Sequence, residues 1–267
     1  MTSGEWLERE ALITVKAYPT PSAKYHETVC IAGITKEEGW IRLYPVQFRS
    51  LPYAQQFEKY QLIHFRMKKH ETDRRPESFR PDVNSIRVTG HIDTTKDEEW
   101  NRRREWISPT LNKGMCEILK EQESSKKSLG VFRPREVTDF LIVDADAEWP
   151  GKKQAFMNQL MLFDPPTSKL EKIPFSFKYK YFCCDEACRG HEQSIIDWEI
   201  YELYRNVRKK TEAVEDIKQK IRDKYLAKLC ASDRDTMFFV GNHSRWPASF
   251  MILGVFWPKK RAPRLFD

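Results

Sequence analysis

The heptapeptide Leu62-Ile63-His64-Phe65-Arg66-Met67-Lys68 alternates apolar and polar side chains along its whole length. Because successive side chains of a β-strand point to opposite faces, this alternation predicts a half-buried strand. Shorter β-branched or alternating runs surround it, at residues 12–17, 28–33, 40–44 and 85–90. Short strands with few helices between them are typical of a small β-barrel, which we expect over residues 1–95.

The middle of the chain changes in character twice. From Glu98 to Glu123 the composition is helical, with a buried stripe expected on one face. Strand signals then return at residues 129–132 and 140–143. We therefore expect a helical insert and a second small β-barrel over residues 96–167.

The final third, residues 168–267, combines strands, cysteines and helices. Aromatic and cationic residues alternate over residues 175–182 and lead into a cysteine cluster. Apolar residues then recur at helical spacing over residues 196–207 and 214–229, which predicts a helix hairpin joined near Lys209 and Lys210. Buried strands are expected at residues 237–241 and 250–256. The predicted fold class is α+β, with two small β-barrels followed by a Cys/His metal-binding module.

Composition limits the classes of function. The chain has 267 residues, of which 40% are hydrophobic and 13% aromatic, so it can bury a substantial core. Lys and Arg exceed Asp and Glu by 46 to 39, a net charge of +7 that permits contacts with phosphate. No apolar run is long enough to span a membrane, and the first residues do not form a secretory signal. We expect a cytoplasmic protein with no membrane partner and with reduced cysteines.

The sharpest local motif is Cys183-Cys184-Asp185-Glu186-Ala187-Cys188-Arg189-Gly190-His191. Zinc prefers four thiolate or imidazole ligands in a tetrahedron, and a tight turn can present several of them. Cys183 or Cys184, with Cys188 and His191, supplies three ligands, and Gly190 relaxes the backbone between them. The fourth must come from elsewhere, and Cys230 and His243 are the candidates. The alternative interpretation is a group of buried thiols beside a surface histidine.

Two carboxylates follow this motif closely. Asp197 and Glu199, with His191, could serve a metal-dependent nuclease in which a divalent ion activates water. Residues two positions apart on a helix point in different directions, which argues against a shared metal. The alternative is that both are acids at a helix N-terminus, where they complement the helix dipole.

Aromatic residues interleaved with cations favour contact with nucleic acid. Trp40, Tyr44 and Phe65 are candidate platforms for stacking bases, and Arg42 and Arg66 are candidate phosphate contacts. Further basic clusters that could meet phosphates occur at residues 102–104, 205–210 and 259–261. The alternative is that the aromatic residues belong to the core and the basic runs are solvated faces.

Several of these segments carry a resemblance to a known family. Residues 28–33, 39–46 and 128–134 resemble the dual OB-fold-containing domain of uncharacterised bacterial proteins, including ones linked to phage defence. The resemblance implies tandem OB-like barrels, over roughly the first 165 residues, that bind a strand or a partner. It carries no catalytic residues. The C-terminal part is similar to a bacterial module in which a Cys-Cys and Gly-His cluster precedes Asp-Trp-Glu.

Together these features predict a sequence-tolerant nucleic-acid-binding accessory protein, with DNA or RNA as partner and zinc as cofactor. It would serve a bacterial defence or DNA-processing system. Two alternatives remain open at this point. One is the metal-dependent nuclease that uses His191, Asp197 and Glu199, and the other is an adaptor that binds a protein partner from the same operon.

Overall fold

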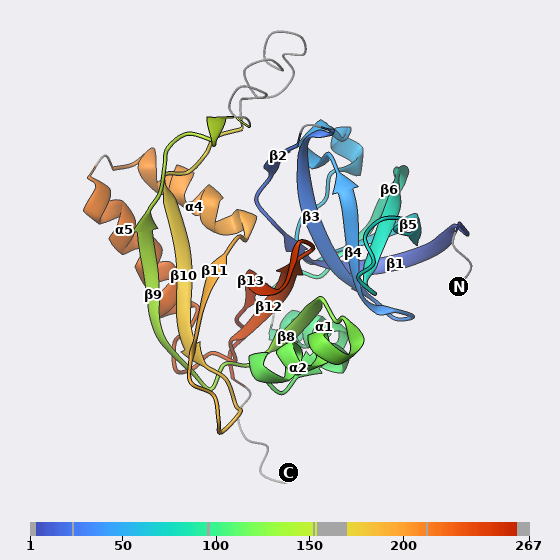
Figure 1. Ribbon diagram of the computed structural model, residues 1–267. Coiled ribbons are helices and arrows are strands. Elements are labelled where there is room, and N and C mark those ends of the chain that lie inside the picture. The colour runs from blue at the N-terminus through green and yellow to red at the C-terminus, as the bar shows by residue number, and fades with distance from the viewer. Residues whose placement is uncertain are drawn as a thin grey trace.

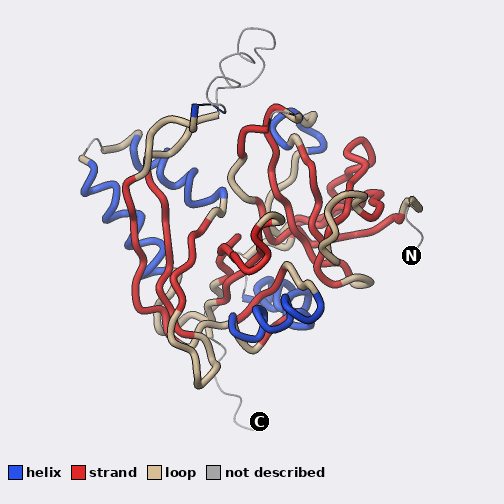
Figure 2. The backbone as a smooth tube through the Cα atoms, viewed as in Figure 1, coloured by secondary structure: helices blue, strands red, loops and turns tan. Residues whose placement is uncertain are grey.

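The computed structural model describes residues 4–22, 24–94, 97–151, 153, 170–211 and 213–260. The fold is α+β and strands predominate, as the sequence predicts. A six-stranded sheet and a seven-stranded sheet lie side by side, with helices against one face of the second sheet and others below the junction (Figures 1 and 2).

The six-stranded sheet contains the N-terminal strands. They are β1 (Leu7–Lys16), β2 (Thr20–Ser22), β3 (His26–Thr35), β4 (Gly39–Val46), β5 (Gln61–Lys69) and β6 (Ser78–His91). Their order is β1-β5-β6-β4-β3-β2, and β1 pairs with β3 as well as with β5. Ile63, Phe65 and Met67 of β5 are fully buried. The alternating heptapeptide therefore forms the half-buried strand that its pattern predicts.

The seven-stranded sheet contains the later strands of the described residues. These are β7 (Leu111–Asn112), β8 (Leu129–Phe132), β9 (Glu136–Asp144), β10 (Phe175–Phe182), β11 (His191–Ile195), β12 (Met237–His243) and β13 (Trp246–Phe256). Their order is β7-β8-β12-β13-β11-β10-β9. The predicted second barrel over residues 96–167 is therefore wrong, because β8 pairs with β12 and β9 pairs with β10. Strand signals mark strands but not their partners, and here the partners come from the final third.

Four helices frame the seven-stranded sheet among the described residues. They are α1 (Asp97–Ile107), α2 (Met115–Ser125), α4 (Trp198–Arg208) and α5 (Val214–Arg222). The 3-10 turn Ser108–Thr110 separates α1 from α2, because Pro109 lacks the amide hydrogen that a continuous helix needs. The predicted helix hairpin is confirmed by α4 and α5, which cover one face of β9, β10 and β11 (Figure 1). The π-helical segment Asp223–Lys228 extends α5.

An apolar core joins the two sheets. One cluster of buried residues draws Leu12 and Trp40 from the N-terminal sheet and Val131 and Phe239 from the C-terminal sheet. The rings of Trp40 and Phe239 meet edge to face, with centroids 5.8 Å apart. The two sheets therefore share one hydrophobic interior, which fixes their relative position.

Candidate functional site

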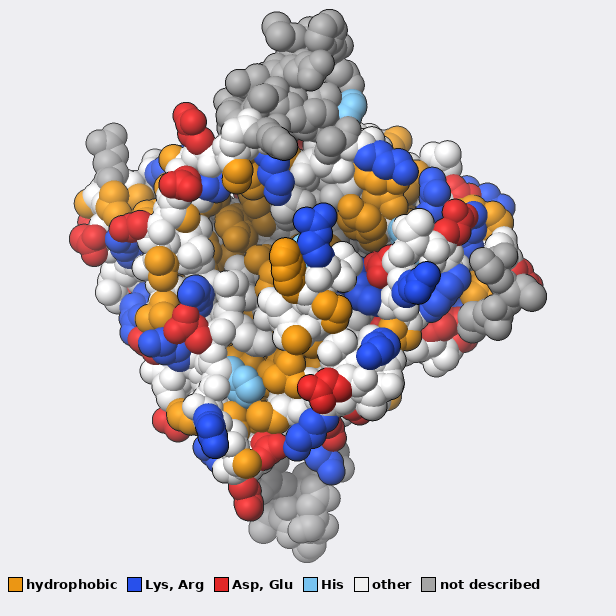
Figure 3. Space-filling view, viewed as in Figure 1, with side chains coloured by type: hydrophobic (Ala, Val, Ile, Leu, Met, Phe, Trp, Pro, Cys, Tyr) orange, Lys and Arg blue, Asp and Glu red, His pale blue; other side chains and the backbone are white. Residues whose placement is uncertain are grey.

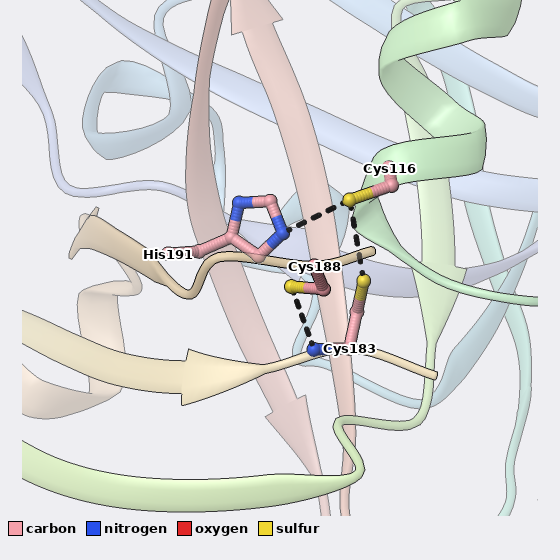
Figure 4. A group of neighbouring side chains, drawn as sticks. All are labelled: Cys116, Cys183, Cys188 and His191. Carbon is pink, nitrogen blue, oxygen red and sulfur yellow. Dashed lines mark hydrogen bonds between the residues drawn. The ribbon is translucent and has the colours of Figure 1, made fainter. Parts of the chain in front are cut away.

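Three cysteines and one histidine converge where α2 meets the β10–β11 turn (Figure 4). The ligand atoms of Cys116, Cys183, Cys188 and His191 all lie within 4.8 Å of one another. The Cys116 Sγ lies 3.5 Å from the Cys183 Sγ and 3.5 Å from the His191 Nε2. Such a cluster of soft and borderline ligands could hold a metal ion.

Local structure explains how the two neighbouring strands present their ligands. Cys183 directly follows the end of β10, and His191 begins β11, which pairs antiparallel with β10. The turn between them contains Cys188 and Gly190, whose φ of +92° lies in the region that glycine adopts freely. The imidazole of His191 stacks on Tyr181, its cross-strand partner, at a centroid distance of 5.2 Å. The turn and the pairing thus fix three of the four ligands.

The fourth ligand comes from a distant part of the sequence. Cys116 lies in the first turn of α2, directly after Gly114 and Met115. A Cβ atom at Gly114 would approach the Cβ of Cys183 to 3.0 Å, so a residue without a side chain lets α2 lie against the cluster. The helix therefore places the Cys116 thiol beside a residue 67 positions later in the chain.

The surroundings suit thiolate and neutral imidazole ligands. The backbone amides of Cys183 and Gly190 donate to the Cys188 Sγ, at 3.5 Å and 3.4 Å. Amide donors stabilise a sulfur that carries negative charge. Burial lowers the pKa of His191, which keeps the imidazole in the neutral form that binds metals. Burial, followed by the neighbouring Cys183 thiol, raises the pKa of Cys116, so a cation in the cluster would relieve the crowding of three thiolates.

The predicted metal ligands are therefore partly brought together. Cys183, Cys188 and His191 meet, whereas the exposed Cys184 turns its thiol to the Arg133 carbonyl. Cys230 donates to the Tyr225 carbonyl at 3.4 Å and takes no part in the cluster. His243 instead accepts from the Arg245 amide. Sequence reasoning missed Cys116, because a single cysteine on a helix gives no spacing signal.

A second feature lies between the two halves of the molecule. A pocket of about 790 Å³ opens where β1 and the loop before β5 face α4 and the end of β13. We refer to it as the junction pocket. The side chains that line it are mainly aromatic or charged, and they are Lys16, Glu58, Lys59, Tyr60, Thr94, Trp100, Arg103, Asp197, Trp198, Glu199, Glu202, Leu203, Asn206, Lys224, Tyr225, Leu229, Val255 and Trp257.

A buried ionic group forms the floor of the junction pocket. The Lys59 Nζ donates to the Asp197 Oδ2 and to the Glu199 Oε2, both at 2.9 Å. Asp197 is 1% exposed, whereas 58% of the Glu199 side chain is exposed. The second carboxylate is therefore open to a ligand.

Burial and charge act in opposite directions in this group. Burial alone would lower the pKa of Lys59, but Asp197 and Glu199 together raise it above its ordinary value. Burial raises the pKa of Asp197 in spite of the neighbouring amine. Nearby, burial lowers the pKa of Lys16 to about 8. Such perturbed groups in a cleft are typical of functional sites.

The predicted nuclease residues do not form one site. Asp197 is the N-cap of α4, and its carboxylate accepts a hydrogen bond from the Glu199 backbone amide at 3.2 Å. The alternative interpretation of Asp197, as an acid at a helix N-terminus, is therefore correct. His191 lies at the far end of β11 from Asp197, and six residue steps of extended chain place the two about 20 Å apart. The imidazole contacts Cys116, so it cannot share an ion with the two carboxylates.

The predicted stacking and phosphate-binding residues are mostly interior. Trp40 is 7% exposed, Phe65 is fully buried, and Arg42 is 1% exposed, so these three cannot meet a strand on the surface. Their alternation with polar residues reflects core packing, which was the alternative interpretation. Tyr44 is half-buried beside His70, and Arg66 is exposed but paired with Asp82. Only these last two of the five remain accessible.

Several arginines of the predicted basic clusters already bind groups of the protein itself. Arg103 donates to the Ile92 carbonyl, Arg104 donates to the Lys259 carbonyl, and Arg205 pairs with Glu171 and Glu202. On the face drawn in Figure 3, cationic and acidic side chains are interspersed rather than gathered in a stripe of one sign. On this face the cationic side chains therefore form no continuous stripe.

None of the helices in the described part of the chain has the length and apolar character needed to cross a membrane. In comparison with known proteins, two adjacent domain families match the chain. The domain of unknown function DUF8758 matches residues 7–109, and the domain of unknown function DUF8757 matches residues 111–267. No curated protein matches the sequence. Because DUF8757 covers more than half of the 267 residues, the chain belongs to the DUF8757 family.

Proposed function

We propose that the chain is a sequence-tolerant nucleic-acid-binding accessory protein. In this proposal the N-terminal sheet is an OB-like barrel, and a zinc ion braces the C-terminal sheet. Nucleic acid enters at the junction pocket between the two sheets. The observation that carries the proposal is the set of aromatic rings and amines that line this pocket.

The pairing of the N-terminal strands supports an OB-like barrel. Five strands follow one another in the cyclic order β1-β3-β4-β6-β5, with β5 pairing again with β1. Every pair is antiparallel except β4 with β6. This pairing order supports a five-stranded Greek-key barrel, an architecture that commonly binds oligonucleotides. In the proposed barrel, the cluster that includes Ile63, Phe65 and Met67 would fill the interior.

Atomic spacing supports zinc as the ion. In a tetrahedral site with Zn–S near 2.3 Å and Zn–N near 2.0 Å, two sulfurs lie roughly 3.8 Å apart and a sulfur and a nitrogen roughly 3.5 Å apart. The Cys116 Sγ lies 3.5 Å from both the Cys183 Sγ and the His191 Nε2. A small adjustment of the sulfurs would admit the ion. Three cysteines and one histidine form a complete set of ligands, which is typical of structural rather than catalytic zinc.

The junction pocket supports contact with a strand better than the surface does. Trp100, Trp198 and Trp257 are half-buried, so each indole keeps area available for stacking. Lys16 and Lys224 lie next to two of these rings and can contact phosphate. Stacking on aromatic rings tolerates any base, because every base has a π-face, and this property suits sequence-tolerant binding.

Fluorescence anisotropy with labelled single-stranded and double-stranded DNA and RNA tests the proposal. We expect binding of single strands at 50 mM salt that weakens as salt is raised to 200 mM, since phosphate contacts release counterions. Absence of binding to every strand at the lower salt concentration would refute the proposal. Metal content measured on the same purified protein tests the zinc centre separately.

A further inference from the structure

We propose that the junction pocket binds one nucleotide unit, with its phosphate on Lys16 and Lys224 and its base among the indoles of Trp198 and Trp257. The inference makes the proposed function more specific, and it depends on that function if the bound nucleotide is the end of a nucleic-acid strand. A free nucleoside monophosphate presents the same chemistry, so the experiment below distinguishes the two sources.

The pocket contains two similar pairs of an amine and an indole. The Lys16 Nζ lies 5.0 Å from the ring centre of Trp198, and the Lys224 Nζ lies 4.6 Å from that of Trp257. Trp198 comes from the start of α4 and Trp257 directly follows β13, so different elements supply the two pairs. A ligand that is both planar and anionic can contact a ring and an amine at once.

Neither amine forms an ion pair with a residue in the described part of the chain. Lys16 donates to the Phe57 carbonyl, and the Lys224 amine lies over the Trp257 ring. Burial lowers the pKa of each lysine, and the nearby acids, Glu199 among them, offset this effect only in part. A bound phosphate would supply the missing negative charge.

Glu199 adds a place for the edge of a base. Its Oε2 accepts from Lys59, whereas its side chain remains 58% exposed within the pocket lining. The carboxylate interacts electrostatically with both Lys16 and Lys224. A carboxylate accepts hydrogen bonds from the amino groups of bases. The pocket volume of about 790 Å³ is ample for one nucleotide.

The experiment measures tryptophan fluorescence of the full chain during titration with AMP, adenosine, inorganic phosphate and a single-stranded DNA 12-mer with or without a 5′-phosphate. Variants Lys16→Gln and Lys224→Gln remove one amine each. The matched control Lys36→Gln removes an exposed lysine that does not line the pocket. Thermal midpoints of all variants show whether the fold is kept.

We expect AMP to quench the fluorescence saturably and each pocket variant to weaken AMP binding at least tenfold, with Lys36→Gln unchanged. Adenosine and phosphate alone should bind more weakly than AMP. If the phosphorylated 12-mer competes with AMP, the ligand is a strand end. If AMP binds and no 12-mer does, the ligand is a free nucleotide and strand binding is refuted. The inference is overturned if AMP does not bind while strands bind equally well with and without a 5′-phosphate. In that case Lys16→Gln and Lys224→Gln should bind the strands as tightly as Lys36→Gln does. If neither AMP nor any strand binds, both proposals fail.

Discussion

Replacement of Cys116 by serine should remove the long-range part of the metal centre. The metal would link Cys116 to Cys183, 67 positions later, and closing a loop of that length in the unfolded chain costs about 4 kcal/mol in the chain-entropy model. Without Cys116 the ion can bridge only the short segment from Cys183 to His191, which constrains the unfolded chain far less. We therefore expect Cys116→Ser to lower the free energy of unfolding by about 4 kcal/mol.

For a chain of this size the loss corresponds to a fall of roughly 8–16 °C in melting temperature. Metal content by mass spectrometry and thermal unfolding by circular dichroism measure the two effects together. Cys184→Ser is the matched control, because its exposed thiol neighbours the cluster without joining it. A chelator should destabilise the wild-type protein by more than it destabilises Cys116→Ser, because the variant has already lost the long-range link. Full metal content in Cys116→Ser, or equal losses in the two variants, would contradict the assignment.

Two further predictions concern the junction pocket. Lys59→Met leaves the buried Asp197 carboxylate, 1% exposed, without its amine, so it should lower the free energy of unfolding in urea by about 3–5 kcal/mol. Glu199→Gln changes an exposed carboxylate and should lower it by less than about 1 kcal/mol. Equal losses in the two variants would contradict the reasoning that burial of Asp197 sets the cost. Competitive acylation mapped by mass spectrometry should give Lys16 half-maximal reactivity near pH 8, because burial disfavours its charged form. Because this pKa is lower in the folded than in the unfolded chain, the unfolded chain binds more protons between pH 8 and 10.5, and the free energy of unfolding should rise with pH over that range. A midpoint near the ordinary value of 10.5 would show that the amine is solvated.

The positions of the strands could be predicted from the sequence, but their pairing could not. β8 and β10 occupy the residues that their β-branched and aromatic runs predict. Pairing depends on contacts between distant segments, and β12 lies beside β8 although more than a hundred residues separate them in sequence. The short strand β11 was missed because His191-Glu192-Gln193-Ser194 has no apolar alternation, and cross-strand pairing with β10 stabilises it.

The candidate metal site shows the same division. Cys183, Cys188 and His191 could be predicted because a single turn carries them all. Cys116 could not, since α2 brings it to the cluster only in the folded chain. Likewise the sequence marks Asp197 as a helix-terminal acid but gives no sign that Lys59 is its partner, 138 positions earlier. Local patterns identify ligands within one turn, whereas tertiary packing selects the rest.

The contact between Arg42 and Ser128 joins the two segments that match different domain families. Arg42 donates to the Ser128 Oγ at 2.6 Å and to its carbonyl at 2.9 Å, and Glu77 accepts from the same hydroxyl. A fragment that ends near residue 109 would lose both Ser128 acceptors of the Arg42 guanidinium and would expose the apolar surface around Trp40. Gene rearrangements should therefore move the two segments as a pair, and separately expressed halves should become soluble only when they are produced together.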